Sequence, residues 1–181
     1  MDHANEILTY YGVWMDPFNP RPDQIRIDDV AHALSKLTRA NGHIDRFYSV
    51  AQHSMNCEKE AAARGYSRML RLFCLLHDAS ECYLSDVTRP IKNRLPGYVE
   101  VEERLQKMIF ETLCGMQPTA EETKLIGKVD DCLLQHEFIK LRGVKVFDET
   151  PCMAAACDFS VADMDTVRIR FLVRYRELAG G

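Results

Sequence analysis

The sequence predicts an all-α fold, and three observations support this prediction. Apolar residues recur at spacings of three, four and seven over most of the 181 residues, which is the period of an amphipathic helix. Serine, threonine and aspartate, which cap helices, precede several of these stretches. The alternation typical of a half-buried strand is not evident, and no internal repeat is present. Because 46% of the residues are apolar, we expect one compact domain over residues 1–181.

The N-terminal segment, residues 1–28, is expected to wrap around this domain. Residues 12–28 are rich in proline and poor in periodic apolar positions, which indicates an ordered loop. From Asp28 the pattern becomes helical, with apolar residues at 30, 34 and 37. Asn41 and Gly42 then offer a helix stop in the left-handed region.

Two helices are expected in the centre of the chain. Ser49 caps the first, which runs to about Arg64 and is ended by Gly65. Ser67 caps the second, which runs to about Tyr83. This second helix is apolar on most sides, so the sequence predicts that it is the central buried helix.

The C-terminal half contains three further predicted helices. A turn-rich connection with two prolines leads into a helix over 98–114, and a helix capped by Thr119 continues to about Leu141. Residues 143–159 are expected to be irregular. Ser160 and Asp163 resemble a capping box for a last helix.

The net charge and the cysteine content restrict the kinds of molecule that the protein is expected to bind and the compartment in which it works. A net charge of −4 argues against tight binding to polymeric nucleic acid, although a small charged substrate needs only a local basic pocket. The seven cysteines lack CxxC spacing, which indicates reduced thiols in a cytoplasmic protein. We find neither a signal peptide nor a membrane-spanning stretch, so we expect no membrane partner.

The doublet His77-Asp78 with Glu81 is the first candidate site. These groups follow the most apolar helix, where an unpaired charge would cost several kcal/mol. Spacings of three and four residues allow the three side chains to converge, and a divalent cation would satisfy them. An isolated HD pair is nevertheless weak evidence for a metal site.

His53 and Asp130 are candidates for completing the site from two other helices. Asp130 lies between apolar residues of a helix that must face the core, and His53 follows the Ser49 cap. Taken alone, Asp130 is as well explained by an ion pair with an arginine, and His53 by a structural role. Two imidazoles and two carboxylates together suit Mn, Co, Fe, Ni, Zn or Mg.

Hydrolysis is the natural reaction for such a site, because a bound metal polarises a phosphoryl oxygen and acidifies water. Glu81 is placed for proton transfer, and Asp86 for orienting water or a sugar hydroxyl. Three cations are candidates for contacts with phosphate, although each is by default a surface residue: Arg39, Arg89 and Lys92.

The pattern of these residues resembles the HD-domain phosphohydrolase superfamily, in which H…HD…D is the metal set. The stretches DDVAHALS, GHIDRFYSVAQHS, LLHDASECYLSDVTRPIK, LPGYVEVEERL and FLVRYREL are similar to a bacterial and phage branch of it. The resemblance implies metal ligands at His53, His77, Asp78 and Asp130, an acid/base role for Glu81 supported by Asp86, and phosphate contacts at Arg39, Lys92 and Arg89. It also implies a homo-oligomer, a dimer or higher.

The substrate implied by the resemblance is a small deoxynucleotide cleaved at its 5′ phosphoester bond. Relatives hydrolyse either deoxynucleoside monophosphates or triphosphates, notably dATP, and both options stay open. Relatives often have an aromatic residue where this chain has Ala40, so Trp14 is a candidate substitute wall for the base. The alternatives are a catalytically silent nucleotide-binding sensor and a purely structural helical module.

Overall fold

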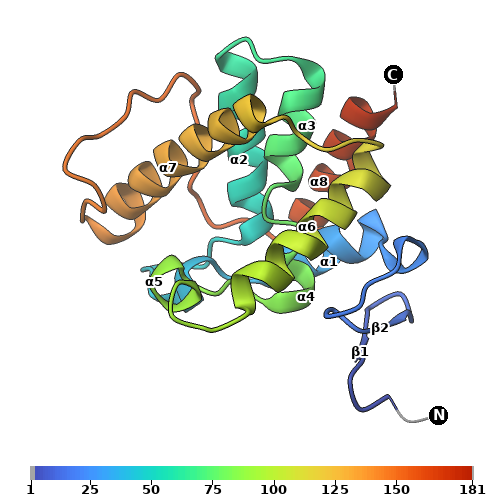
Figure 1. Ribbon diagram of the computed structural model, residues 1–181. Coiled ribbons are helices and arrows are strands. Elements are labelled where there is room, and N and C mark those ends of the chain that lie inside the picture. Colours follow the sequence, from blue (N-terminus) through green and yellow to red (C-terminus); the bar gives the residue numbers. More distant parts are fainter. Residues whose placement is uncertain (1–2, 181) are drawn as a thin grey trace.

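The computed structural model describes residues 3–180 and is predominantly helical, which confirms the all-α prediction (Figure 1). The helices are α1 (Ile27–Lys36), α2 (Val50–Ala63), α3 (Arg68–Leu76), α4 (Glu81–Leu84), α5 (Arg89–Lys92), α6 (Tyr98–Cys114), α7 (Ala120–Arg142) and α8 (Met164–Ala179). Two 3₁₀ turns cover Pro22–Gln24 and Arg39–Gly42. None of the helices in this described part combines the length and apolar composition needed to cross a bilayer.

The predicted helix starts follow from side-chain caps. The hydroxyls of Ser49, Ser67 and Thr119 each accept a hydrogen bond from the backbone N–H three residues later, as predicted. The prediction for the last helix was wrong in detail. Asp163, rather than Ser160, caps α8 by accepting from the N–H of Thr166.

Helices α2 and α3 form the centre of the molecule. Helix α2 packs against α1, α3, α7 and α8, while α3 also packs against α6. The side chains of Phe73, Leu75 and Leu76 on α3 are fully buried, and Phe73 packs edge-on against Phe110 of α6. Each such side chain stabilises the fold by roughly 1.5–3 kcal/mol. The prediction that this helix is the buried one is therefore confirmed.

The central helix ends earlier than the sequence indicated. We expected it to continue to about Tyr83, but α3 stops at Leu76. The amide of Gln106 on α6 donates to the carbonyl of Leu76 and accepts from the N–H of Ser80, which are the two groups that a continuous helix would pair with each other. A side chain inserted into the helical ladder in this way breaks the helix. His77 and Asp78 consequently lie in a turn.

The end of α1 also differs from the prediction. Helix α1 ends at Lys36, although Ala40 and Asn41 do adopt left-handed backbone angles with φ near 50°. The backbone of Leu37 and Arg39 is instead paired with the segment before α2, through the N–H of Val50 and the carbonyl of Tyr48. These hydrogen bonds compete with continuation of the helix.

The described part of the N-terminal segment contains a two-stranded antiparallel ribbon of β1 (Ile7–Leu8) and β2 (Trp14–Met15). Strands of two residues are too short to show an alternating pattern, which is why the sequence did not reveal them. Met15 anchors the ribbon because its side chain is fully buried in the core.

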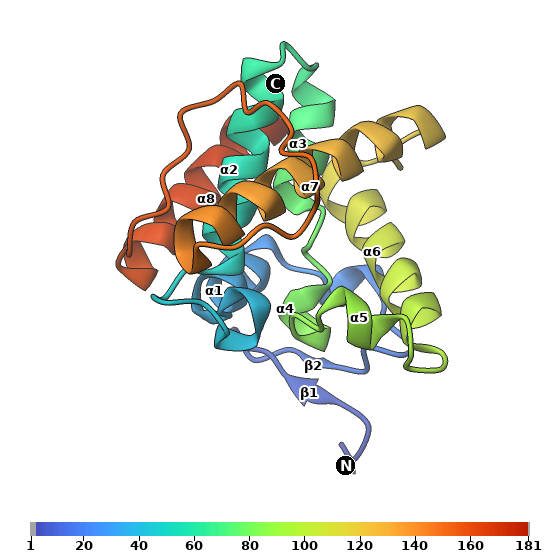
Figure 2. The same cartoon turned by 90° about the vertical axis from the view of Figure 1, so that its left-hand side faces the viewer.

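Polar side chains of α2 and α7 hold the irregular segment 143–163. Figure 2 shows the path of this segment from the end of α7 to the start of α8. The buried carboxylate of Glu60 accepts hydrogen bonds from the N–H groups of Ala154 and Ala155 and from Arg64. Burial opposes ionisation of Glu60, but these donors lower its pKa overall. The segment is therefore fixed at definite positions although it has no regular secondary structure.

Candidate metal centre

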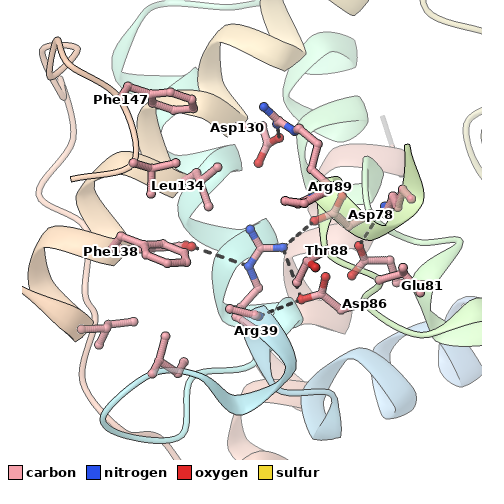
Figure 3. Close-up of a pocket in the computed structure, with 18 of the residues that line it drawn as sticks. Arg39, Asp78, Glu81, Asp86, Thr88, Arg89, Asp130, Leu134, Phe138 and Phe147 are labelled. Atoms are coloured by element: carbon pink, nitrogen blue, oxygen red, sulfur yellow. Dashed lines mark hydrogen bonds and ion pairs between the residues drawn. The ribbon is translucent and has the colours of Figure 1, made fainter. Parts of the chain in front are cut away.

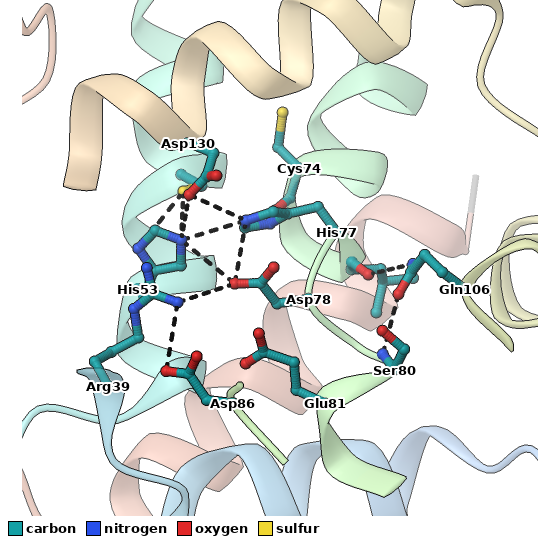
Figure 4. A network of polar contacts seen from close by, with 12 residues as sticks. Arg39, His53, Cys74, His77, Asp78, Ser80, Glu81, Asp86, Gln106 and Asp130 are labelled. Atoms are coloured by element: carbon teal, nitrogen blue, oxygen red, sulfur yellow. Dashed lines mark hydrogen bonds and ion pairs between the residues drawn. The ribbon is translucent and has the colours of Figure 1, made fainter. Parts of the chain in front are cut away.

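Four predicted side chains converge from three parts of the chain (Figure 4). His53 comes from α2, His77 and Asp78 from the turn after α3, and Asp130 from α7. The Nε2 atoms of the two histidines are 3.3 Å apart. From Nε2 of His53, the oxygens Oδ2 of Asp78 and Oδ1 of Asp130 lie at 3.6 and 3.2 Å, and from Nε2 of His77 they lie at 3.3 and 3.7 Å.

These spacings agree with the size of a metal site. Nitrogen and oxygen donors about 2.1 Å from one cation lie roughly 3.0–3.4 Å from their neighbours in octahedral or tetrahedral arrangements. The observed spacings of 3.2–3.7 Å between donors are close to this range. A cation at their centre would bridge the two Nε2 atoms and the two carboxylate oxygens.

Both histidines are oriented by their second ring nitrogen. Nδ1 of His77 donates to the carbonyl of Cys74 at 2.8 Å, and Nδ1 of His53 is 2.6 Å from Oε1 of Glu137. Because Nδ1 carries the proton in these contacts, Nε2 of a neutral imidazole keeps its lone pair for the centre. The sequence interpretation missed Glu137, although it lies on the same helix as Asp130 and seven residues later, hence on the same face.

The charge states also suit a cation. Burial alone would raise the pKa of Asp130, but hydrogen bonds from the Nε2–H groups of His53 and His77, whose protons a cation would replace, hold this pKa well below its usual value. Burial likewise opposes ionisation of Asp78, and His77 and Arg39 lower its pKa overall. Both carboxylates are therefore ionised at neutral pH.

Cys57 is a further group beside the centre. Its sulfur is 3.5 Å from Nε2 of His53, so the buried group His53, Cys57 and His77 could hold a metal ion. Burial raises the pKa of the Cys57 thiol to about 12, which keeps it protonated. The ionised carboxylates are thus better donors than this thiol. The sequence interpretation missed this neighbour, which lies four residues after His53 on the same helix face.

Glu81 lies beside the four donors without being one of them (Figure 4). Its side chain is buried, and its Oε2 atom has no hydrogen-bond partner within residues 3–180. Lys92 is its nearest cation, with Nζ 3.6 Å from Oε1. Burial, followed by the negative charges of Asp78 and Asp86, raises the pKa of Glu81 well above its usual value. An unpartnered buried carboxyl group is unusual and often functional.

Arg39 connects the centre to Asp86. Its guanidinium lies 3.2 Å from Asp78, 3.6 Å from Glu137 and 3.9 Å from Asp86. Asp86 also accepts a hydrogen bond from the N–H of Ala40 at 3.0 Å. The left-handed backbone at Ala40 is thereby tied to the far side of the site, and the three carboxylates share one cation.

The other two predicted cations are also paired with carboxylates. Lys92 donates to Glu102 at 2.5 Å. Arg89 is more than half exposed and lies 3.0 Å from Asp131 and 3.4 Å from Asp130. Arg39, Arg89 and Lys92 therefore surround the centre, but each is already in contact with at least two acidic side chains.

A cavity of about 560 Å³ opens at the centre (Figure 3). Asp78, Glu81, Asp86 and Asp130 line it together with the three predicted cations. A second cavity of about 500 Å³ shares Asp78, Lys92 and Asp130 with the first, so the centre is reached from two sides. The four predicted donors lie at the junction, where His53 is fully buried.

The expectation that Trp14 forms a wall of this cavity was wrong. Trp14 does not line either cavity, and its ring stacks on His3 with centroids 3.9 Å apart. Ala40 does line the first cavity, but the aromatic side chains there are Phe138 of α7 and Phe147 of the irregular segment. The sequence interpretation missed both phenylalanines, because neither lies in a recognisable motif.

Two curated bacterial proteins match about half of the chain. The uncharacterized protein YfdR of Escherichia coli K12 is 38% identical over 96 residues, which cover 53% of this chain and 51% of YfdR. The uncharacterized protein RCAP_rcc00048 of Rhodobacter capsulatus is 42% identical over 99 residues, which cover 52% of this chain and 50% of that protein. The chain thus spans about half the length of these relatives, and neither name assigns an activity. No protein-family model matches the sequence.

Proposed function

We propose that this protein is a metal-dependent phosphohydrolase of the HD-domain type, which cleaves the bond between the α-phosphorus and the 5′ oxygen of a deoxynucleotide. The observation that carries the proposal is the convergence of two Nε2 atoms and two carboxylates, with both imidazoles oriented by their Nδ1 contacts. The resemblance of the same residues to the H…HD…D metal set supports it.

His53, His77, Asp78 and Asp130 are the residues that would hold the ion. This mixed set of nitrogen and oxygen donors suits Mn, Co, Fe, Ni, Zn or Mg. When bound, a divalent cation supplies positive charge for the phosphoryl group and acidifies water. Glu137 and the carbonyl of Cys74 would keep the two imidazoles in the orientation that this role requires.

Glu81 is the proposed proton-transfer residue. Glu81 lines the cavity next to the donors, and its buried Oε2 atom has no hydrogen-bond partner in the described chain. The neutral carboxyl group would donate its proton to the departing 5′ oxygen as the oxygen of a water molecule bonds to the α-phosphorus, and the resulting carboxylate would then accept the proton that this water releases. Asp86 would support this by holding Arg39 and the Ala40 turn in place.

The charges of the cavity favour a monophosphate over a triphosphate substrate. Three cationic side chains line it together with the neutral carboxyl group of Glu81 and four other acidic side chains, a balance of −1 before any metal binds. One divalent ion would make this balance +1, which suits the charge of about −2 on a phosphate monoester better than the larger negative charge of a triphosphate. Since Arg39, Arg89 and Lys92 are all paired with carboxylates, none is free to hold a β,γ tail.

Product analysis tests the proposal. Metal-loaded protein is incubated with each deoxynucleoside monophosphate and triphosphate, and the released groups are separated by ion-exchange chromatography. We expect orthophosphate from monophosphates and at least about tenfold slower turnover of triphosphates, a difference of about 1.4 kcal/mol. Tripolyphosphate released at a comparable rate would contradict the monophosphate preference. Bound metal without release from any nucleotide would favour the sensor alternative.

Glu137→Gln tests the orientation of His53. Glutamine keeps the size of the side chain but removes the charge that holds Nδ1–H of His53. We expect metal affinity to fall about 10–100-fold, the usual cost of losing an outer-shell partner. Competition with a chromophoric chelator measures this affinity. Glu111→Gln, an exposed change on α6, is the matched control and should leave the affinity unchanged.

A further inference from the structure

The cavity has two chemically different ends. Its polar lining side chains come from Arg39, from the segment 78–93, and from Asp130 and Glu137 of α7. The remaining lining is apolar along α7 and the irregular segment after it, where Figure 3 shows Leu134, Phe138 and Phe147 on one side of the cavity. The apolar lining residues in this part are Ile44, Leu134, Phe138, Leu141, Val146 and Phe147.

This apolar end is not part of the main hydrophobic core. The core cluster, including the partly buried side chains packed on it, contains neither Phe138 nor Phe147 nor Leu134. These three side chains are only partly buried, so their apolar surface faces the cavity. Partly exposed phenyl groups in a concave site are suited to a flat apolar ligand group, because such a group would remove them from water.

Gln135 fixes the position of Phe147. Its fully buried amide accepts hydrogen bonds from the N–H groups of Val146 and Phe147, each at 2.9 Å. It also donates to the carbonyl of Phe147 and to the hydroxyl of Thr150, each at 3.0 Å. All four hydrogen-bonding positions of the amide are thereby used. A segment without regular structure is thus attached to the rigid helix that carries Phe138.

We propose that Phe138 and Phe147 form a binding slot for the nucleobase, and that Gln135 is a positioning residue that sets the distance of Phe147 from the metal centre. This inference rests on the proposed function, since the phosphate would lie at the polar end. The side chains of the slot carry no hydrogen-bonding groups. The slot therefore binds a base by stacking and apolar contact, and purines bind better than pyrimidines because their rings are larger.

A substrate without a base separates the contribution of the nucleobase to binding from that of the phosphate and sugar. Kinetics are measured with dAMP and with 2-deoxyribose 5-phosphate, which has the same phosphoester but no base. In the unaltered protein we expect KM to be at least about tenfold lower for dAMP, the order expected for one stacked base. Phe138→Ala should remove most of this advantage and leave KM for 2-deoxyribose 5-phosphate unchanged.

Two further variants complete the test. Gln135→Ala should raise KM for dAMP while kcat and both constants for 2-deoxyribose 5-phosphate stay the same, whereas a merely structural role would change both substrates alike. Phe18→Ala removes an exposed aromatic side chain that lines neither cavity, and it should change nothing. Equal KM values for the two substrates in the unaltered protein, or an equal rise in both in Phe138→Ala, would overturn the slot.

Binding of deoxyadenosine separates this inference from the proposed reaction. Saturation-transfer NMR detects the nucleoside without phosphate, metal or turnover, and we expect a signal that Phe138→Ala abolishes. If no nucleotide is hydrolysed but this signal depends on Phe138, the proposed function fails and the slot stands. If dAMP is hydrolysed and the signal is absent or independent of Phe138, the slot fails and the proposed function stands.

Discussion

Replacing Asp130 by alanine is expected to abolish metal binding and phosphohydrolysis together. The change removes one of two ionised carboxylates, whose Oδ1 lies 3.2 and 3.7 Å from the Nε2 atoms of His53 and His77. The loss of metal affinity should exceed the roughly 10–100-fold that an outer-shell partner contributes. Elemental analysis of the purified variant measures the metal, and release of orthophosphate measures the activity.

Thermal unfolding gives a second measurement of this prediction. A metal present at about 100 times its Kd stabilises the folded protein by about 2.7 kcal/mol. For a chain of this length that corresponds to a rise in Tm of roughly 5–10 °C. We expect this rise in the unaltered protein, its reversal by a chelator, and no metal-dependent rise in Asp130→Ala.

Asp131→Ala is the matched control for this variant. Asp131 is the next residue on α7 and also pairs with Arg89, at 3.0 Å, but it has no contact with either histidine of the centre. Its removal should leave metal content and turnover almost unchanged. A normal metal content in Asp130→Ala, or an equal loss in both variants, would show that the four-donor assignment is wrong.

Replacing Glu81 by glutamine is expected to lower kcat about 10²–10⁴-fold, the usual contribution of a positioned acid/base group. The amide has the same shape but cannot transfer the proton. Metal content should stay normal, because Glu81 is not among the donors. Stability at neutral pH should be unchanged or higher, since the variant removes a carboxyl group whose ionisation is opposed by burial.

Glu102→Gln is the matched control for Glu81→Gln. Glu102 contacts Lys92 from the second cavity, just as Glu81 does from the first, so both variants remove a charge beside the same lysine. We expect only a small change of kcat in Glu102→Gln. If metal-loaded unaltered protein turns over no faster than Glu81→Gln, the nucleotide-binding sensor is the better interpretation.

Local sequence determined much of the fold. Ser49, Ser67 and Thr119 begin their helices through contacts within one turn, so these starts could be predicted without knowing what the helices pack against. The burial of α3 also followed from its composition. The end of α3 did not, because it depends on Gln106, thirty residues away from Leu76 in the chain.

The candidate site also has one part that the sequence predicted and another that only the structure revealed. The sequence alone predicted His53, His77, Asp78 and Asp130 as a set, because charged or polar groups in apolar helices need a common partner. In the structure an oxygen of each carboxylate lies within 3.7 Å of both histidine Nε2 atoms. Their roles as ligands, and that of Glu81 in proton transfer, stay predictions.

Only the tertiary structure decided how that set is oriented and what surrounds it. Glu137 orients His53, Arg39 joins three carboxylates, and Gln135 attaches Phe147 to α7. Each of these contacts joins residues whose spacing along the chain follows no local pattern. The sequence therefore predicted which residues would form the candidate site, while the packing of α2, α7 and the irregular segment determined its geometry and the apolar wall of the cavity.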